Sequence, residues 1–297
     1  PMTFCTSFLT QGSGMIDGRS QIRQRAGLRL WLSAGWLSLL ALAAIFAPFV
    51  APQDPLVQDL FTSRLPPFWQ DGAEPGYWLG TDNLGRDVLS RIIYGARVAL
   101  GVAILAATLA GLIGGIFGLL AGFYRGWVDI IVSRVIDIWM SFPPVLFAIL
   151  LIAVLGTGLH SIVLAIVIID WTRFARVVRV EAMTQGAMDY VDAATVAGSG
   201  RFGILMREIL PNVLPTIVVL VTLQMGIAVI VEAILSFVNL SISTDSPTWG
   251  GMIAEGRIAI YQAWWVLVFP LITLFLTVLS FSQLGEGLKD RFDPVLR

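Results

Sequence analysis

Residues 180–215 read VEAMTQGAMDYVDAATVAGSGRFGILMREILPNVLP, a polar and helix-favouring segment between two strongly apolar ones. A polar insert held between two membrane spans has to contact something outside the bilayer. Gly198-Ser199-Gly200 interrupts the helical pattern, because glycine favours helix ends. We therefore predict a helix, a glycine elbow and a second helix over 201–208, which Leu210 and Pro211 terminate. The small-residue face expected to contact a partner, at helical spacing, consists of Tyr190, Ala193, Ala194 and Ala197.

The composition of the chain is that of a membrane protein. Of its 297 residues, 57% are hydrophobic and 13% are charged, whereas soluble domains contain about 25% charged residues. Apolar runs long enough to cross a bilayer recur along the sequence. We predict an all-α integral membrane protein with six transmembrane helices. Fourteen of the nineteen Lys and Arg residues fall on the predicted inner side, which places both termini and the loop at 181–212 in the cytoplasm.

The residue types restrict the chemistry that this chain can perform. A single cysteine, Cys5, and a single histidine, His160, leave no Cys/His ligand set for a metal. The one lysine, Lys289, is not preceded by the glycine of a phosphate-binding loop, so ATP would have to bind another subunit. We predict no enzyme activity, no catalytic residue, no metal, no cofactor on this chain and no nucleic-acid partner.

The sequence divides into five regions. Asp87 and Arg91 stand four residues apart in a segment, 79–100, whose apolar stripe predicts a short interfacial helix with an ion pair. Five prolines exclude a continuous helix over 51–77. The regions are a cytoplasmic tail (1–27), a first transmembrane helix (28–50), an outer loop containing the interfacial helix (51–95), a transmembrane core (96–288) and a cytoplasmic tail (289–297).

Two features predict how the core packs. Gly114, Gly118 and Gly122 are spaced by four, so one face of the second span, 96–122, is bare backbone against which another helix can pack. In the third span, 130–155, a Pro-Pro pair falls near mid-depth. A broken helix at that depth is tolerated where neighbours or a water-filled cavity satisfy the freed carbonyl groups.

At the inner end of this span, Arg134 is expected to reach Asp129 or Asp137.

Charged residues within the spans are candidates for a transport pathway. Asp170 lies deep in the fourth span, where a carboxylate costs at least ~2.5 kcal/mol on insertion scales. We expect its partner to be Arg173 or an amine of a transported substrate, and a purely structural Asp–Arg pair remains an equal alternative. The pathway candidates are Ser141, Pro143, Pro144, Asp170 and Glu232.

Several motifs resemble the permease subunits of bacterial ABC importers. The "EAA" loop of that family is similar to Asp192-Ala193-Ala194, then Gly198, then Ile209-Leu210-Pro211, with aspartate in place of the usual glutamate. The dipeptide and oligopeptide branch carries an element similar to LGTDNLGRDVLSR at 79–91, and its closing motif is similar to LGEGLKDRFDP at 284–294. The residues of the first element that match are Gly80, Thr81, Asp82, Gly85, Arg86, Asp87, Ser90 and Arg91.

The resemblance implies an ABC type I importer permease fold and the C-type member of a permease pair in the bacterial plasma (inner) membrane. The chain would form half of a translocation pathway for dipeptides or oligopeptides beside a sister permease. Two ABC ATPase subunits, which hold ATP and Mg²⁺, would dock on the loop at 181–212. A periplasmic or lipid-anchored solute-binding protein would deliver the peptide.

Other functions remain open from the sequence. The same importer class includes carriers of nickel, glutathione and opines, although a nickel path would be expected to show His or Cys ligands. An ion-coupled secondary transporter would use Asp170 and Glu232 as coupling residues. A membrane enzyme is the least favoured alternative, since one His and one Cys offer little for a catalytic site.

Overall fold

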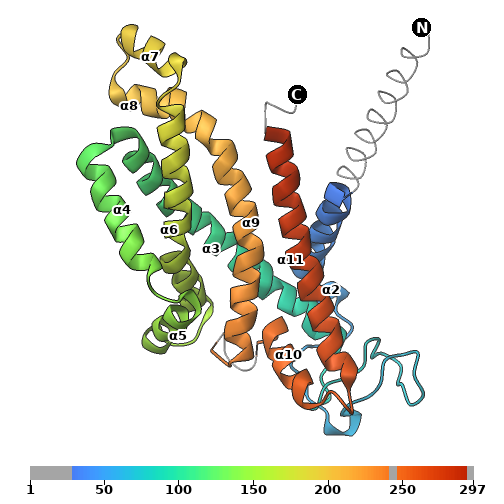
Figure 1. The fold of residues 1–297 in the computed structure, drawn as a ribbon. Coiled ribbons are helices and arrows are strands. Elements are labelled where there is room, and N and C mark those ends of the chain that lie inside the picture. The colour runs from blue at the N-terminus through green and yellow to red at the C-terminus, as the bar shows by residue number, and fades with distance from the viewer. Residues whose placement is uncertain (1–28, 241–245, 293–297) are drawn as a thin grey trace, which may run out of the picture.

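The computed structural model describes residues 29–240 and 246–292 (Figure 1). In these ranges the regular structure is helical, apart from one isolated bridge between Thr81 and Asp87, and residues 51–87 are irregular except for one short 3-10 helix. The predicted all-α fold is confirmed. The helices are Arg29–Ile45, α2 (Ala47–Val50), η1 (Leu60–Thr62), α3 (Val88–Tyr124), α4 (Gly126–Met140), α5 (Pro144–Leu155), α6 (Leu159–Gln185), α7 (Asp189–Val196), α8 (Arg201–Ile204), the π-turn η2 (Leu205–Ile209), α9 (Leu210–Phe237), α10 (Trp249–Ile258) and α11 (Trp264–Phe292).

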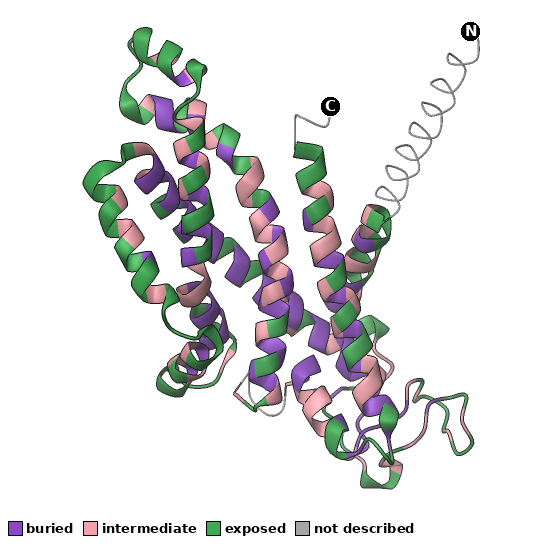
Figure 2. Ribbon diagram, in the orientation of Figure 1, coloured by how far each residue is buried: buried purple, intermediate pink, exposed green. Residues whose placement is uncertain are grey.

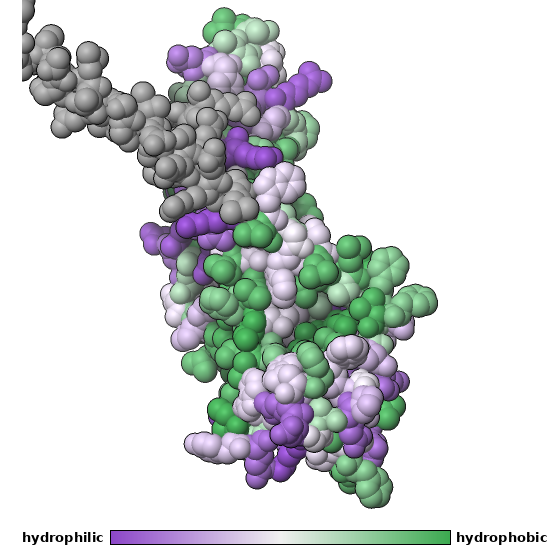
Figure 3. Space-filling model, turned by 90° about the vertical axis from the view of Figure 1, so that its right-hand side faces the viewer, coloured by the Kyte–Doolittle hydropathy of each residue, from purple (hydrophilic) through white to green (hydrophobic). Residues whose placement is uncertain are grey.

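By length and composition, three helices of the described ranges could cross a membrane: α3, the run Arg201–Phe237 and α11. The pair α4 and α5 would be a fourth if it forms one broken span. Figure 3 shows apolar side chains across the middle of one face and polar side chains at both ends, as expected for a protein surrounded by lipid. Six spans also require Arg29–Ile45, which is shorter, and α6, which carries charged side chains, so that number stays a prediction.

The segment that was predicted as an outer loop with an interfacial helix, 51–95, differs from the prediction. There is no separate interfacial helix, because α3 runs without a break from Val88 to Tyr124. Asp87 does not pair with Arg91. It caps α3 by accepting a hydrogen bond from the Ser90 backbone N–H at 2.8 Å. Cap geometry explains the difference, since an N-cap side chain turns back towards the first free N–H groups of its helix.

Among the described helices, α3 and α6 make the most extensive contact, and the predicted glycine face forms it. A Cβ atom added to Gly114 would lie 2.2 Å from the carbonyl oxygen of Trp171, and one added to Gly122 would lie 2.4 Å from that of Arg179. Gly118 has the same relation to Ala175, at 2.7 Å. Small residues therefore let the two backbones approach each other directly, as predicted.

The predicted break at Pro143 and Pro144 is present. α4 and α5 meet at an angle of 87°, with Pro144 in the first turn of α5, where a missing N–H costs nothing. The predicted ion pairs of Arg134 are wrong. Their carboxylates pair instead with α6, Asp129 with Arg179 and Asp137 with Arg176 at 3.2 Å, because α6 lies alongside α4.

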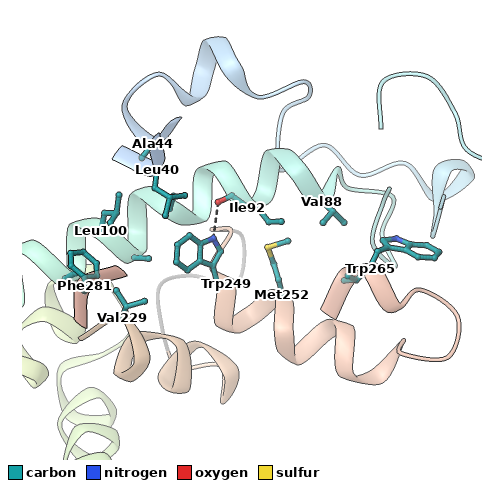
Figure 4. Close-up of a cluster of buried hydrophobic side chains, with 14 of the residues drawn as sticks. Leu40, Ala44, Val88, Ile92, Leu100, Val229, Trp249, Met252, Trp265 and Phe281 are labelled. Atoms are coloured by element: carbon teal, nitrogen blue, oxygen red, sulfur yellow. Dashed lines mark hydrogen bonds between the residues drawn. The ribbon is translucent and has the colours of Figure 1, made fainter. Parts of the chain in front are cut away.

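The core at the end opposite α7 is built around Trp249, the first residue of α10 (Figure 4). Its side chain is fully buried, and its indole N–H donates to the carbonyl of Ile92 at 3.0 Å. The ring packs against the backbone of Gly95 of α3, where an added Cβ atom would lie 2.8 Å from Trp249 Cδ1. This packing fixes α10 to α3, while Val229 and Phe281 bring α9 and α11 into the same cluster.

The two ends of the described chain lie on one side of the molecule. The start of Arg29–Ile45 and the end of α11 point towards the end that carries α7 and α8, and α10 lies at the opposite end (Figure 1). The predicted N-terminal tail, 1–27, lies outside the described residues, whereas the predicted C-terminal tail begins inside α11, which continues to Phe292.

Candidate functional site

The predicted elbow between α7 and α8 is present, and Gly198 forms it. Gly198 has φ +87°, and its N–H donates to the carbonyl of Thr195 at 3.0 Å. The next residue, Ser199, donates to the carbonyl of Ala194 at 3.0 Å. These two bonds are the Schellman pattern, which satisfies the last carbonyls of a helix and requires a left-handed residue, nearly always glycine.

The elbow is held to the ends of α6 and α9 by a small polar network. The Tyr190 hydroxyl donates to Gln185 at 2.8 Å and accepts from Asn212 at 3.3 Å. Partial burial raises the pKa of the Tyr190 hydroxyl, and the hydrogen bond with Asn212 opposes that shift. Val191 is buried beside Ile204 and its neighbours in an apolar cluster. The loop is therefore a folded extension of two long helices.

The exposed surface of this loop differs from the predicted small-residue face. Tyr190 and Ala194 pack against the apolar cluster, whereas Ala193, Ala197 and Asp192 are exposed. Two large apolar side chains outside the predicted face project beside them: Val196 is 90% exposed and Phe202 is 66% exposed. The sequence could have indicated them, because they are large apolar residues on either side of a glycine elbow in an otherwise polar segment. Figure 2 shows that most of the loop is exposed.

The helix after the elbow does not end at Leu210 and Pro211 as predicted. It continues through the π-turn Leu205–Ile209 into α9, so Arg201–Phe237 is one run. In an α-helix the ring of Pro211 would clash with the carbonyl four residues earlier. The wider π-turn precedes the proline and relieves that clash. The elbow is consequently joined to the whole length of α9.

A recess lies at the break between α4 and α5, on the side covered by α6. It contains about 400 Å³ of empty space, including space that is open to the outside. The indole N–H of Trp139 donates to the Ile168 carbonyl at 2.6 Å and ties α4 to α6 beside it. The lining residues are Trp139, Met140, Phe142, Pro144, Phe147, Ile169, Asp170, Thr172 and Arg173.

The structure brings some of the pathway candidates to this recess and places others elsewhere. Asp170 and Pro144 line it. Ser141 donates to the carbonyl of Asp137 at 2.9 Å, and neither it nor Pro143 is a lining residue. Glu232 is buried on α9 and accepts a hydrogen bond from Ser236 one turn further on. Glu232 is not among the residues that line the recess.

The motif at 79–91 folds into a tight structural unit. Gly80 and Gly85 have φ +80° and +76°, and a Cβ on Gly85 would lie 1.8 Å from the Asp59 carbonyl oxygen. Thr81 accepts from the Leu65 backbone at 2.8 Å, and its carbonyl accepts from the Trp265 indole at 3.0 Å. The motif therefore fixes the segment before α3 against α11.

The charged residues of this motif form a buried network with α10. Asp82 is fully buried and accepts from Arg86 Nε at 2.7 Å and from Arg91. Both guanidinium groups also reach Glu255 of α10, at 2.8 and 2.7 Å. Burial raises the pKa of Asp87, and hydrogen bonds from Ser90 oppose that shift. Asp82 and Arg86 come from the segment before α3, Arg91 from α3 and Glu255 from α10, so their ion pairs clamp these three parts of the chain together.

Most of these features lie in a stretch of the chain that matches a family of transport proteins. Residues 114–297 match the family described as "Binding-protein-dependent transport system inner membrane component". This stretch contains the glycine face, the broken helix, the elbow and α9 to α11. The chain belongs to this family. The resemblance stated from the motifs is thereby confirmed, and the family is one of transport components, not enzymes.

Named relatives of this permease cover nearly all of it. It is 37% identical to the di/tripeptide transport system permease protein DppC of Pseudomonas aeruginosa, over 88% of this chain and 86% of the relative. Identity to the glutathione transport system permease protein GsiD of Pectobacterium atrosepticum is 38%, over 90% and 87%. Identity to the dipeptide transport system permease protein DppC of Haemophilus influenzae is 35%, over 88% and 89%.

Proposed function

We propose that this permease forms one half of the translocation pathway of an ABC importer for short peptides in the bacterial inner membrane. The observation that carries the proposal is the α7–Gly198–α8 elbow, a folded and exposed projection beyond the apolar middle of the molecule. A helical projection with exposed Val196 and Phe202 is suited to enter a groove on another protein. We assign that protein as an ATPase subunit in the cytoplasm.

Peptides are the substrate class that the relatives favour. Two of the relatives are named for dipeptides or di/tripeptides and one for glutathione, and glutathione is itself a tripeptide. All of these share an ammonium group, carboxylates and amide bonds. The predicted partners are a sister permease, two ATPase subunits that supply ATP and Mg²⁺, and a solute-binding protein on the outer side.

Coupling follows from the continuity of the helices. ATP-driven approach of the two ATPases would move the elbow, and the run Arg201–Phe237 would carry that displacement across the membrane as a rigid element. α6 enters the elbow from the other side and packs on α3 through backbone contacts, so α3 would move with it. The recess at the α4–α5 break lies along α6 and would change shape in the same step.

Two experiments test the proposal. Purification of the tagged permease from its native membrane is expected to bring two ATPase chains and a second permease with it. The complex in liposomes, supplied with its binding protein, is expected to take up radiolabelled dipeptide only when ATP is present. A permease recovered alone, with uptake driven by a proton or sodium gradient, would contradict the proposal and favour the secondary transporter.

Replacing Gly198 with leucine is expected to lower ATP-dependent uptake at least tenfold. A non-glycine residue at φ +87° costs roughly 1–2 kcal/mol and unwinds the Schellman turn that sets the angle between α7 and α8. Uptake and ATP hydrolysis are measured on the same liposomes, and hydrolysis without uptake is the expected signature of uncoupling.

Gly200 provides the matched control for Gly198. It belongs to the same elbow and, like Gly198, has open space around its missing side chain, but its φ is −68°. Gly200→Leu is expected to keep uptake within about twofold of wild type, because its backbone suits any residue. Equal losses in the two variants would mean that the leucine side chain blocks a contact surface and that the turn geometry is not the cause.

A further inference from the structure

We propose that the recess at the α4–α5 break is a binding subsite for the charged end groups of a zwitterionic substrate, with Asp170 holding an ammonium group and Arg173 a carboxylate. The inference rests on the proposed function, because it names the part of a short peptide that the pathway recognises. It adds a site on this chain itself, separate from the site of any solute-binding protein.

The two charged groups of the recess are held near each other without pairing. Gln224 of α9, which is 2% exposed, lies between them. Its amide nitrogen donates to Asp170, and its amide oxygen is 3.5 Å from Arg173 Nη1. Within the described part of the chain, no ion pair within 4.0 Å joins Asp170 to Arg173, although the Arg173 charge still acts on Asp170 across the amide. Neither charged group is occupied by direct contact with the other, so an opposite charge on a ligand could approach each of them.

The other charges along α6 behave differently. Arg176 and Arg179, one and two turns beyond Arg173, each pair directly with a carboxylate of α4. A structural role would predict the same arrangement for Asp170, which lies three residues before Arg173. The insertion of a neutral amide between Asp170 and Arg173 therefore distinguishes this pair from the structural pairs on the same face.

The depth of the site favours a water-filled pathway over lipid. Asp170 lies eleven residues after the start of a 27-residue helix, which puts it ~16 Å along a ~40 Å element. Arg173 is exposed on the isolated chain. A guanidinium at that depth is too costly against hydrocarbon and lies where water, a partner or a substrate can solvate it.

The walls of the recess complement the charges. Trp139, Phe142 and Phe147 come from the broken helix, and the rings of Phe142 and Phe147 are stacked with centroids 5.7 Å apart. Aromatic walls with a few polar groups on one side are typical of small-molecule sites. An ammonium group suits a carboxylate, a carboxylate suits a planar guanidinium, and an apolar side chain suits the rings.

Photo-crosslinking locates the ligand directly. The probe is the dipeptide of alanine and benzoylphenylalanine, added to the detergent-purified complex of the permease with its membrane and ATPase partners, without the solute-binding protein. Mass spectrometry is expected to find the crosslink within residues 139–147. Excess free alanyl-phenylalanine is expected to abolish it, and the N-acetylated, C-amidated dipeptide is expected to leave it intact, because the capped peptide lacks both charges.

Variants assign the two charges. Asp170→Asn and Arg173→Gln are each expected to lower the crosslink yield about tenfold, because each variant removes one hydrogen bond between oppositely charged groups. Asp137→Asn, which removes a carboxylate paired with Arg176 outside the recess, is the matched control and is expected to retain it. If the variants fail to assemble, the competition on the wild-type complex still decides the question.

The outcomes separate the subsite from the proposed function. A crosslink outside 139–147, or equal competition by free and capped dipeptide, would overturn the subsite even if the wild-type complex imports peptides. A crosslink in the recess together with no ATP-driven peptide uptake would uphold the subsite and contradict the proposed function.

Discussion

Replacing Asp82 with alanine is expected to lower the free energy of unfolding of the permease by ~3–5 kcal/mol, the typical cost of breaking a buried ion pair. Asp82 is fully buried. Within the motif at 79–91, it is the carboxylate that pairs with both Arg86 and Arg91. It also accepts the backbone N–H groups of Leu84 and Arg86 at 2.8 and 3.0 Å.

The loss would have two causes. Without Asp82, two buried guanidinium groups would share Glu255, whose side chain is 36% exposed and therefore partly screened by water. Two backbone N–H groups would also lose their acceptor, and each unsatisfied buried donor costs ~1–3 kcal/mol. The clamp between the segment before α3, α3 and α10 would be weakened, because Glu255 alone would then hold Arg86 and Arg91 to α10.

Unfolding of the purified permease by SDS, followed by circular dichroism, measures this effect. Asp71→Ala removes an exposed carboxylate of the same outer segment and is expected to change the free energy of unfolding by less than about 0.5 kcal/mol. Asp82→Asn keeps an acceptor oxygen for the backbone and is expected to fall between the two. A loss below about 1 kcal/mol for Asp82→Ala, the range of surface pairs, would show that the clamp does not hold the fold.

Replacing Gly114 with leucine is expected to prevent the permease from folding. Alanine alone would put its Cβ 2.2 Å from the Trp171 carbonyl oxygen and 2.9 Å from the Ala175 backbone nitrogen. These are backbone atoms of α6, so no side chain can move aside, and α3 would have to separate from α6. Overpacking by small groups costs ~1–3 kcal/mol, and leucine adds three further carbons at a contact that continues through Gly118 and Gly122.

Gly101 on the same helix is the matched control. A Cβ atom there meets nothing within 4 Å. Gly101→Leu is expected to give normal amounts of monodisperse protein in size-exclusion chromatography, whereas Gly114→Leu is expected to give aggregate or no protein in the membrane. Recovery of folded Gly114→Leu at the wild-type level would mean that the α3–α6 contact can widen freely.

Features set by neighbouring residues were predictable from the sequence. The break at Pro143 and Pro144 follows from the missing N–H groups of proline, and the elbow at Gly198 follows from the conformational freedom of glycine. The glycine face of α3 follows from the helical period, because residues four apart lie on one side of any helix. The family followed from motifs that stand in continuous stretches of the chain.

The prediction failed where a choice between local alternatives depended on distant residues. Asp87 and Arg91 have the spacing of a helical ion pair, yet Arg91 reaches Glu255, 164 residues away. Arg134 has the spacing to pair with Asp129 or Asp137, yet both carboxylates face α6. A charged side chain takes the partner that packing brings closest, and spacing in the sequence covers only the partners on its own helix.

The sequence by itself determined that this protein is an all-α membrane permease, where its helices break and turn, and which helix face is bare backbone. Those properties depend on composition and on contacts within about one helical turn. Only the tertiary structure decided which charges pair, that Val196 and Phe202 stand exposed at the elbow, and that Gln224 separates Asp170 from Arg173. These depend on how helices far apart in the chain pack together, and the packing is set by the summed fit of many side chains.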